Sequence, residues 1–288
     1  MRKLILVFSI VALFASCQKD ALTPTPPAPP IVIAKPVTYL DLSYGSQALQ
    51  KMDIYLPEGR TTSTTKTIVL IHGGAWIGGD KTEMTFIVDS IKKRKPDFAF
   101  VNINYRLAIN GAANVFPTQE VDVKAAIDFY LAKTATYEVS KDLILLGASA
   151  GGHLALLHAY KNDPEKHVKA VVDFYGPTDL VAMWNEGFLM QFGLIVVVGN
   201  SYTGNPSIYT QSSPVNYITA QSPPTIVLQG LMDELVSPSQ STILIDKLNT
   251  AGVSHQLVTY PNEGHGFSAA DNTDALNKIM PFLATYVK

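Results

Sequence analysis

The sequence predicts an α/β fold in which a mostly parallel central sheet of about eight strands is flanked by helices on both faces. Short apolar runs alternate with longer segments whose apolar residues recur at helical spacing. Glycine-rich turns follow several of these runs, at the strand ends where open α/β sheets form their sites. The chain has 288 residues, of which 47% are hydrophobic, so it can bury the core of one large domain.

The strands and helices follow from these patterns in chain order. The strands are predicted at 37–40, 52–56, 68–71, 99–103, 143–146, 170–174, 225–228 and 256–260. The first two have no helix between them and should form an antiparallel edge of the sheet. The helices are predicted at 82–95, 117–133, 152–161, 238–251 and 273–287. In the second helix, Val123, Ala126 and Ile127 share one face, and Gly252 is a stop signal for the fourth.

A nucleophile motif follows the fifth predicted strand. Residues 147–151 read Gly-Ala-Ser-Ala-Gly, and a predicted helix comes next. In this context Gly-x-Ser-x-Gly is typical of the nucleophile elbow of serine hydrolases, which holds Ser149 on a sharp turn. Glycines are needed beside it because a side chain there would collide with the neighbouring strand or helix. The pattern alone is a weak signal, since glycine and serine are both common.

A second glycine-rich motif supports the first. Residues 72–76 read His-Gly-Gly-Ala-Trp and directly follow the strand predicted at 68–71. We expect the backbone N–H groups of Gly73, Gly74 and Ala75, with that of Ala150, to form an oxyanion hole. An ordinary glycine-rich turn is the alternative, and the neighbouring elbow disfavours it.

The acid and the base come from two further loops. Asp233 follows the strand predicted at 225–228, and His265 lies between glycines after the last predicted strand. Ser149 would attack a carbonyl, His265 would take its proton, and Asp233 would hold the imidazole. Glu234 is an alternative acid by its position alone.

The other histidines have structural interpretations. His72 would tie down the oxyanion loop through its ring. His153 and His158 fall on the helix after the elbow, where packing or hydrogen bonding is expected. His167 is read as a loop residue and His255 as a surface residue before a strand.

On these residues the chain resembles the α/β-hydrolase superfamily. It is similar to the small carboxylesterase branch related to hormone-sensitive lipase, and to bacterial feruloyl and acetylxylan esterases. The segments that carry the resemblance are 52–57, 72–76, 104–107, 116–117 with 122–126, 147–152, 213–217 and the Asp233 and His265 loops. The chain departs from the family pattern at Gln229, where a histidine is usual, and at Ala75 and Ala148, where that branch has a glycine and an acid. The resemblance implies an α/β-hydrolase fold.

A long insertion, 177–222, precedes the acid loop and resembles a lid. It contains Trp184, Phe188 and Phe192, which either shape the substrate pocket or pack the insertion onto the core. Trp76, beside the oxyanion glycines, has the stronger claim to the pocket. The sequence leaves these alternatives open.

Composition excludes several other functions. The net charge is −2, and no basic stripe or lysine-rich tail appears, which argues against nucleic acid as a partner. The chain has one cysteine, which excludes an intrachain disulfide and a thiol nucleophile in the fold. The predicted chemistry needs no cofactor and no metal.

The first residues predict export. Arg2 and Lys3 precede an apolar run, 4–16, that is too short to span a bilayer, so 1–16 is predicted to be a signal peptide. Residues 13–17, Leu-Phe-Ala-Ser-Cys, resemble a bacterial lipobox, in which Cys17 would carry the lipid. A chance cysteine after a plain signal peptide is the alternative. The proline-rich segment 17–36 would be a semi-rigid linker to a catalytic domain at 37–288.

The sequence thus predicts a lipoprotein in the periplasm or on the cell surface, acting as a serine carboxylesterase. The resemblance implies acetyl or feruloyl esters of polysaccharides as substrates. A serine peptidase of the prolyl-oligopeptidase type shares the order Ser149, Asp233, His265 and is the first alternative. A non-catalytic binding protein on the same fold is the second.

Overall fold

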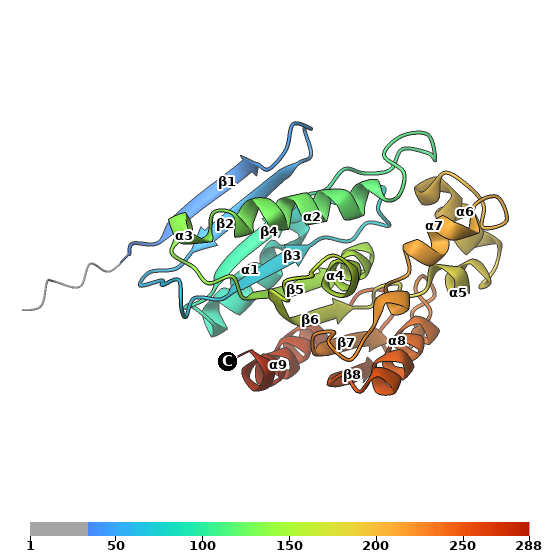
Figure 1. Ribbon diagram of the computed structural model, residues 1–288. Helices are drawn as coiled ribbons and strands as arrows, with labels where there is room; N and C mark the ends of the chain where they lie inside the picture. The colour runs from blue at the N-terminus through green and yellow to red at the C-terminus, as the bar shows by residue number, and fades with distance from the viewer. Residues whose placement is uncertain (1–33, 288) are drawn as a thin grey trace, which may run out of the picture. The chain divides into compact units, whose positions relative to one another are not determined.

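A computed structural model describes residues 34–287 (Figure 1). The predicted signal peptide, Cys17 and nearly all of the predicted linker lie outside these residues. The described chain contains an eight-stranded sheet of order β1-β2-β4-β3-β5-β6-β7-β8. The strands are β1 (Val37–Ser43), β2 (Lys51–Leu56), β3 (Thr67–Ile71), β4 (Ala99–Ile103), β5 (Leu143–Ala148), β6 (Val168–Phe174), β7 (Thr225–Gly230) and β8 (His255–Tyr260).

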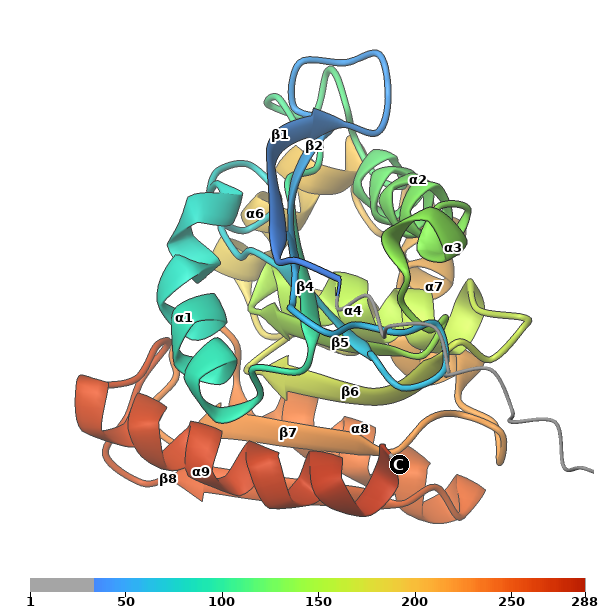
Figure 2. The ribbon, with the colours of Figure 1, turned by 90° about the vertical axis from the view of Figure 1, so that its left-hand side faces the viewer.

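The strand pairing confirms the predicted sheet. Strands β3 to β8 pair in parallel, and β2 is antiparallel to both β1 and β4. Figure 2 shows the twist of the sheet, in which β1 and β2 run across the direction of β7. The parallel strands end level with one another: Gly147 pairs with both Ile71 and Asp173. The segments that leave these ends therefore meet at one edge of the sheet.

Helices cover both faces of the sheet, as predicted. The longer ones are α1 (Thr85–Arg94), α2 (Thr118–Leu131), α4 (Ala150–Lys161), α8 (Pro238–Ala251) and α9 (Ala269–Tyr286). The apolar residues of α1 and α9 join one core cluster, and those of α2, α4 and α8 join the other. Figure 2 shows α1 and α2 on opposite sides of β4.

The central strand β3 contributes side chains to the core clusters on both faces of the sheet. Its residues alternate between the clusters: Ile68 and Leu70 belong to one, and Val69 and Ile71 to the other. All four are at most 1% exposed. A strand buried on both faces reads as a continuous apolar run, which is why residues 68–71 lack a polar alternation.

Three predicted segments differ in detail. The last helix begins earlier than predicted, at Ala269, because the side chain of Ser268 caps it by accepting from the N–H of Asp271. The helix predicted at 82–95 is a 3₁₀ turn, η1 (Lys81–Met84), followed by α1. The insertion holds the short helices α5 (Leu180–Trp184), α6 (Phe188–Val198) and α7 (Pro206–Gln211) and the 3₁₀ turn η2 (Pro214–Tyr217). A further short helix, α3 (Thr134–Tyr137), directly follows the second predicted helix.

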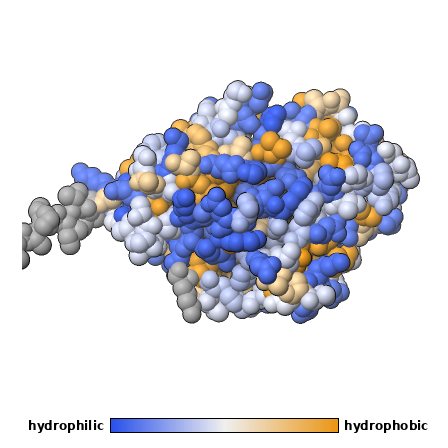
Figure 3. Space-filling view, viewed as in Figure 1, coloured by the Kyte–Doolittle hydropathy of each residue, from blue (hydrophilic) through white to orange (hydrophobic). Residues whose placement is uncertain are grey.

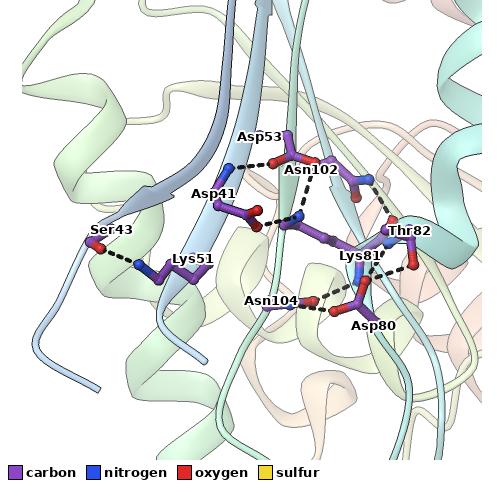
Figure 4. Close-up of polar contacts among 9 residues, drawn as sticks. All are labelled: Asp41, Ser43, Lys51, Asp53, Asp80, Lys81, Thr82, Asn102 and Asn104. Atoms are coloured by element: carbon purple, nitrogen blue, oxygen red, sulfur yellow. Dashed lines mark hydrogen bonds and ion pairs between the residues drawn. The ribbon is translucent and has the colours of Figure 1, made fainter. Parts of the chain in front are cut away.

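A buried polar cluster joins the edge strands to the segment after β3 (Figure 4). The Nζ of Lys81 lies 2.9 Å from Asp41 Oδ1 and 3.0 Å from Asp53 Oδ2. Lys81 and Asp53 are both 5% exposed. Burial acts to lower the pKa of Lys81, but the two carboxylates outweigh it and raise this pKa. The ammonium therefore stays charged and holds β1 and β2 together.

The same cluster fixes the backbone of Lys81. The side chain of Asn102 donates to the Lys81 carbonyl at 2.5 Å, and the Lys81 N–H donates to Asn104 Oδ1 at 2.5 Å. Asn104 Nδ2 also donates to Asp80 Oδ2 at 2.7 Å. Strand β4 and the residue after it thus anchor the far end of the glycine-rich loop 72–80.

The surface seen from the direction of Figure 1 is mixed. Figure 3 shows hydrophilic residues over the middle of this face and hydrophobic residues in separate groups around it. Within 34–287, no helix is both long enough and apolar enough to cross a membrane.

Candidate active site

The elbow between β5 and α4 has the strained geometry that its glycines predict. Ser149 lies at φ 54° and ψ −122°, a conformation that costs about 1–3 kcal/mol for a residue with a side chain. A Cβ on Gly147 would lie 2.1 Å from the carbonyl oxygen of Gly151. A Cβ on Gly151 would lie 2.1 Å from the carbonyl oxygen of Ile71. Both contacts are with backbone atoms, so neither position has room for a side chain.

Ser149, His265 and Asp233 meet at the edge where the parallel strands end. His265 Nε2 lies 2.9 Å from Ser149 Oγ, and His265 Nδ1 lies 2.8 Å from Asp233 Oδ2. An ionised carboxylate only accepts, so the proton of the neutral imidazole is on Nδ1. Nε2 is then an acceptor, and the Ser149 hydroxyl donates to it. This is the arrangement in which an imidazole can remove the serine proton.

The carboxylate of Asp233 is held from several sides. Its Oδ1 accepts from the N–H groups of Leu235 at 2.9 Å and Val236 at 2.8 Å, and its side chain is fully buried. Gln229 Nε2 contacts Oδ2 at 3.4 Å and also donates to the carbonyl of Val236 at 3.3 Å. Glu234 is exposed and makes no hydrogen bond to His265 among the described residues.

Gln229 lies beside Asp233, and its sequence context does not predict this contact. In the sequence it differs from the family pattern, which usually has a histidine at this position. In the structure its amide bridges the end of β7 and the acid loop, and its Oε1 accepts from Ser241 of α8 at 2.8 Å. The departure itself was the signal: a polar residue at the end of a buried strand needs partners, and the acid loop supplies them.

The loop after β3 borders the same site. Gly74, Ala75 and Trp76 all have positive φ values, of 98°, 49° and 60°. Gly74 and Ala75 donate their N–H groups to no other described residue. The N–H of Ala150 is at the first position of α4, where a helix provides no partner. Gly73, Gly74, Ala75 and Ser149 all border one cavity.

Two cavities open at Ser149, and both are bordered by Ala75 and Leu235. The larger, of about 450 Å³, is bordered by His265 and has polar side chains in its wall. These polar side chains are Glu83, Tyr175 and Asn272. The smaller, of about 270 Å³, is almost entirely apolar. Its wall includes Trp76, Ile77, Met183, Leu189, Met190, Phe192, Gly193, Val196 and Val197.

The structure separates the residues predicted for the pocket. Trp76 lines the apolar cavity and Phe192 does too, but Trp184 and Phe188 line neither cavity. The expectation for Trp184 and Phe188 is therefore corrected. The Trp184 ring packs edge-on against Tyr209 of α7, in the same insertion, with 5.5 Å between ring centroids, and Tyr209 is a buried member of the core cluster. Phe188 is 82% exposed at the start of α6.

The remaining histidines have the structural positions that were expected near the site. His153 is fully buried, its Nε2 lies 2.6 Å from the carbonyl of Ser212, and burial lowers its pKa to about 4. His158 is also buried, with its pKa lowered to about 4. Residues 34–287 contain no group of three His, Cys, Asp or Glu side chains suited to a metal.

Comparison with known families agrees with this geometry. The BD-FAE family model matches residues 52–248, more than half of the chain. The chain belongs to the BD-FAE family. The resemblance found in the sequence, to α/β-hydrolases of the esterase type, is thereby confirmed.

Two proteins of Mycobacterium tuberculosis (strain ATCC 25618 / H37Rv) are similar in sequence to this BD-FAE member. The probable carboxylic ester hydrolase LipM is 34% identical over 79% of this chain and 56% of its own length. The esterase LipC is 28% identical over 79% of this chain and 59% of its own length. The chain thus spans somewhat more than half the length of these relatives.

Two solved structures are similar in fold. A bifunctional GH43-CE protein of Bacteroides eggerthii has a TM-score of 0.75 at 29% identity, covering 87% of this chain and 38% of its own. A truncated carbohydrate esterase from gut microbiota has a TM-score of 0.73 at 24% identity, covering 88% of this chain and 97% of its own. The BD-FAE member described here thus has the α/β-hydrolase fold.

Two helical glycines give a matched test of the elbow. Gly151→Ala should destabilise the fold by about 1–3 kcal/mol or more, because the new methyl group meets the Ile71 backbone. Gly193→Ala, in the interior of α6, meets nothing within 4 Å and should stabilise by about 0.5–1 kcal/mol. Urea unfolding measures both variants. Equal stability of the two would contradict the close approach at the elbow.

Proposed function

We propose that the protein is a serine carboxylesterase that hydrolyses carboxylic esters through an acyl-enzyme. The hydrogen-bonded chain from Asp233 through His265 to Ser149 supports this most directly. It ends beside N–H groups that have no partner among the described residues. The relatives named as esterases support an ester, rather than another acyl compound, as the substrate.

In the proposed reaction, the Ser149 proton moves to His265 Nε2 while Oγ bonds to the ester carbonyl carbon. The carbonyl oxygen becomes an oxyanion, which the N–H groups of Gly73, Gly74, Ala75 and Ala150 stabilise. The imidazolium, stabilised by Asp233, then gives its proton to the alcohol oxygen as the ester bond breaks. Water repeats the sequence on the acyl-enzyme and releases the acid.

We assign the two halves of the substrate to the two cavities. The leaving alcohol must receive its proton from His265, so it lies in the larger cavity, which His265 borders. The acyl group is then left to the apolar cavity beside α6. A protein cavity of about 150 Å³ can hold benzene, so about 270 Å³ has room for an aromatic acyl group or a medium-length chain.

A polysaccharide ester fits this division. The polar wall of the larger cavity, with Glu83 and Asn272, suits a hydroxylated alcohol. The apolar cavity suits a feruloyl group, whereas an acetyl group would leave most of its volume empty. The structural neighbour named as a carbohydrate esterase favours the same class. We therefore propose acylated sugars as the natural substrates.

Substitution in the hydrogen-bonded chain tests the reaction. Ser149→Ala and His265→Ala should each lower kcat for an aryl ester by at least about 10⁴-fold, because the residues act as one unit. Wild type should react with a fluorophosphonate probe, and Ser149→Ala should not. His167→Ala, which changes a partly buried histidine paired with Glu165 and outside both cavities, is the matched control and should retain full turnover.

The same experiment separates the alternatives. Absence of probe labelling in the wild type would favour a binding protein. Hydrolysis of peptide amides in preference to aryl esters would favour a peptidase. Retained turnover in His265→Ala would contradict the assignment of the base.

Filling the apolar cavity tests the place of the acyl group. Gly193→Leu should lower kcat/KM for cinnamoyl-type and medium-chain esters by about 10-fold or more, with little change for acetyl esters. Phe188→Ala, on the same helix but outside the cavity, should leave this profile unchanged. Equal losses for short and long acyl groups in Gly193→Leu would contradict the assignment.

We also propose that the protein is exported and anchored through a lipid on Cys17, as its first residues predict. Cys17→Ala should then move the protein from the membrane fraction to the soluble fraction, with its esterase activity unchanged. Fractionation of cells that express each form measures this. Retention of the variant on membranes would refute the lipid anchor.

A further inference from the structure

A buried tyrosine hydroxyl contacts the backbone of the oxyanion loop. Tyr105 follows β4 and is 1% exposed. Its hydroxyl lies 3.0 Å from the carbonyl oxygen of His72 and 3.1 Å from that of Gly73. Its ring stacks on the His72 ring at 4.3 Å with an interplanar angle of 7°. Burial raises the pKa of Tyr105, so the hydroxyl keeps its proton and donates to these carbonyls.

The direction of these two carbonyls decides the direction of two N–H groups. In a planar trans peptide, the C=O and the N–H of one unit point in opposite directions. The carbonyl of His72 shares its peptide unit with the N–H of Gly73. The carbonyl of Gly73 shares its unit with the N–H of Gly74. One hydroxyl shared between both carbonyls therefore turns both N–H groups away from itself.

His72 acts on the same carbonyl. Its Nδ1 lies 2.8 Å from the carbonyl oxygen of Gly73, which can only accept, so Nδ1 carries the proton. Burial lowers the pKa of His72, so the ring is neutral and its Nε2, which has no partner among the described residues, is unprotonated. A Cβ on Gly79 would lie 2.6 Å from Nδ1, so the loop closes tightly around this contact.

These contacts stabilise a segment whose backbone conformation is unfavourable by itself. Three consecutive residues after Gly73 have positive φ, and two of them, Ala75 and Trp76, are not glycine. Such a conformation persists only where the surroundings fix it. At one end of the loop are the Tyr105 and His72 contacts, and at the other is the Lys81 cluster of Figure 4.

We propose that Tyr105 is a positioning residue that aims the N–H groups of Gly73 and Gly74 at the carbonyl oxygen of the bound ester. The proposal rests on the proposed esterase function. Tyr105 borders neither cavity and acts through the backbone. An oxyanion donor contributes most in the transition state, so misaligned donors lower kcat and leave KM almost unchanged.

Two buried tyrosines whose hydroxyls contact opposite ends of β3 give a matched experiment. Tyr105→Phe removes the hydroxyl at the C-terminal end of β3. Tyr130→Phe removes a hydroxyl that is equally buried and lies 2.8 Å from Thr67 Oγ1, at the start of β3. Kinetics with an aryl ester, the affinity for a trifluoromethyl ketone inhibitor and the melting temperature are measured for both.

Tyr105→Phe should lower kcat by about 10- to 100-fold, less than the loss of a whole oxyanion donor, with KM within about two-fold. Affinity for the ketone, which forms a tetrahedral adduct, should fall by a similar factor. Tyr130→Phe should lower the melting temperature at least as much, with kcat unchanged. This contrast separates alignment of the loop from general stability.

A second variant keeps the test independent of folding. His72→Phe preserves the stacked ring and removes only the second donor to the Gly73 carbonyl, so it should also lower kcat without raising KM. An unchanged kcat in either folded variant, or a loss that appears only in KM, would overturn the proposal. A wild-type protein without esterase activity would overturn the proposed function instead, which distinguishes the two failures.

Discussion

The site depends on how closely the backbone of the elbow approaches the end of β3. The space for a Cβ on Gly151 is occupied by the carbonyl oxygen of Ile71, and a Cβ on Gly73 would lie 3.3 Å from Ser149 Cβ. A Cβ on Gly151 would also lie 2.5 Å from the carbonyl oxygen of His72, so the elbow and the loop after β3 are packed together largely through main-chain atoms, which cannot change rotamer. This contact exists because β3 and β5 are neighbours in the sheet and end at the same level. The separation between Ser149 and the backbone of Gly73 and Gly74 is thus set by the sheet.

The acid and the base are positioned in a different way. Their loops leave β7 and β8, which lie farther along the sheet from β3. Asp233 is held by two N–H groups of its own loop, and Gln229 ties that loop to β7. His265, whose side chain is 21% exposed, contacts the ring of Tyr175 at 4.9 Å. Asp233 and His265 are thus positioned largely by hydrogen bonds and contacts of side chains, whereas Ser149 is positioned by main-chain packing.

This difference explains what the sequence could predict. The strands are predicted by local apolar runs. The three candidate catalytic side chains are predicted by the glycines and polar residues that follow three of these runs. The rule that parallel strands end at one edge brings Ser149, Asp233 and His265 together without any knowledge of side-chain packing. The helix start at Ser268 is also a local signal, a capping serine, although it was not used.

The apolar insertion could not be resolved in the same way. In α6 nearly every residue is apolar, so periodicity does not identify the side that faces the cavity. Trp184 and Phe192 are both aromatic in one insertion, yet one packs on Tyr209 and the other borders the cavity. Tyr105 and Lys81 were missed for a related reason. The partners of Lys81 lie on β1, β2 and β4, and those of Tyr105 lie just after β3, so the segment 104–107 carries a family resemblance without revealing these contacts.

Two buried carboxyl groups at the ends of neighbouring strands show why Asp233, rather than Asp173, suits the role of the acid. Asp173 accepts one backbone N–H, from Gly176, and its Oδ2 has no partner among the described residues. Burial consequently raises the pKa of Asp173 to about 7. Asp233 is as deeply buried but accepts two backbone N–H groups and contacts His265 and Gln229. Donors of this number stabilise a carboxylate in a buried position. The hydrogen bonds of the loop that carries Asp233, more than the burial of its carboxyl group, therefore hold Oδ2 against His265 Nδ1.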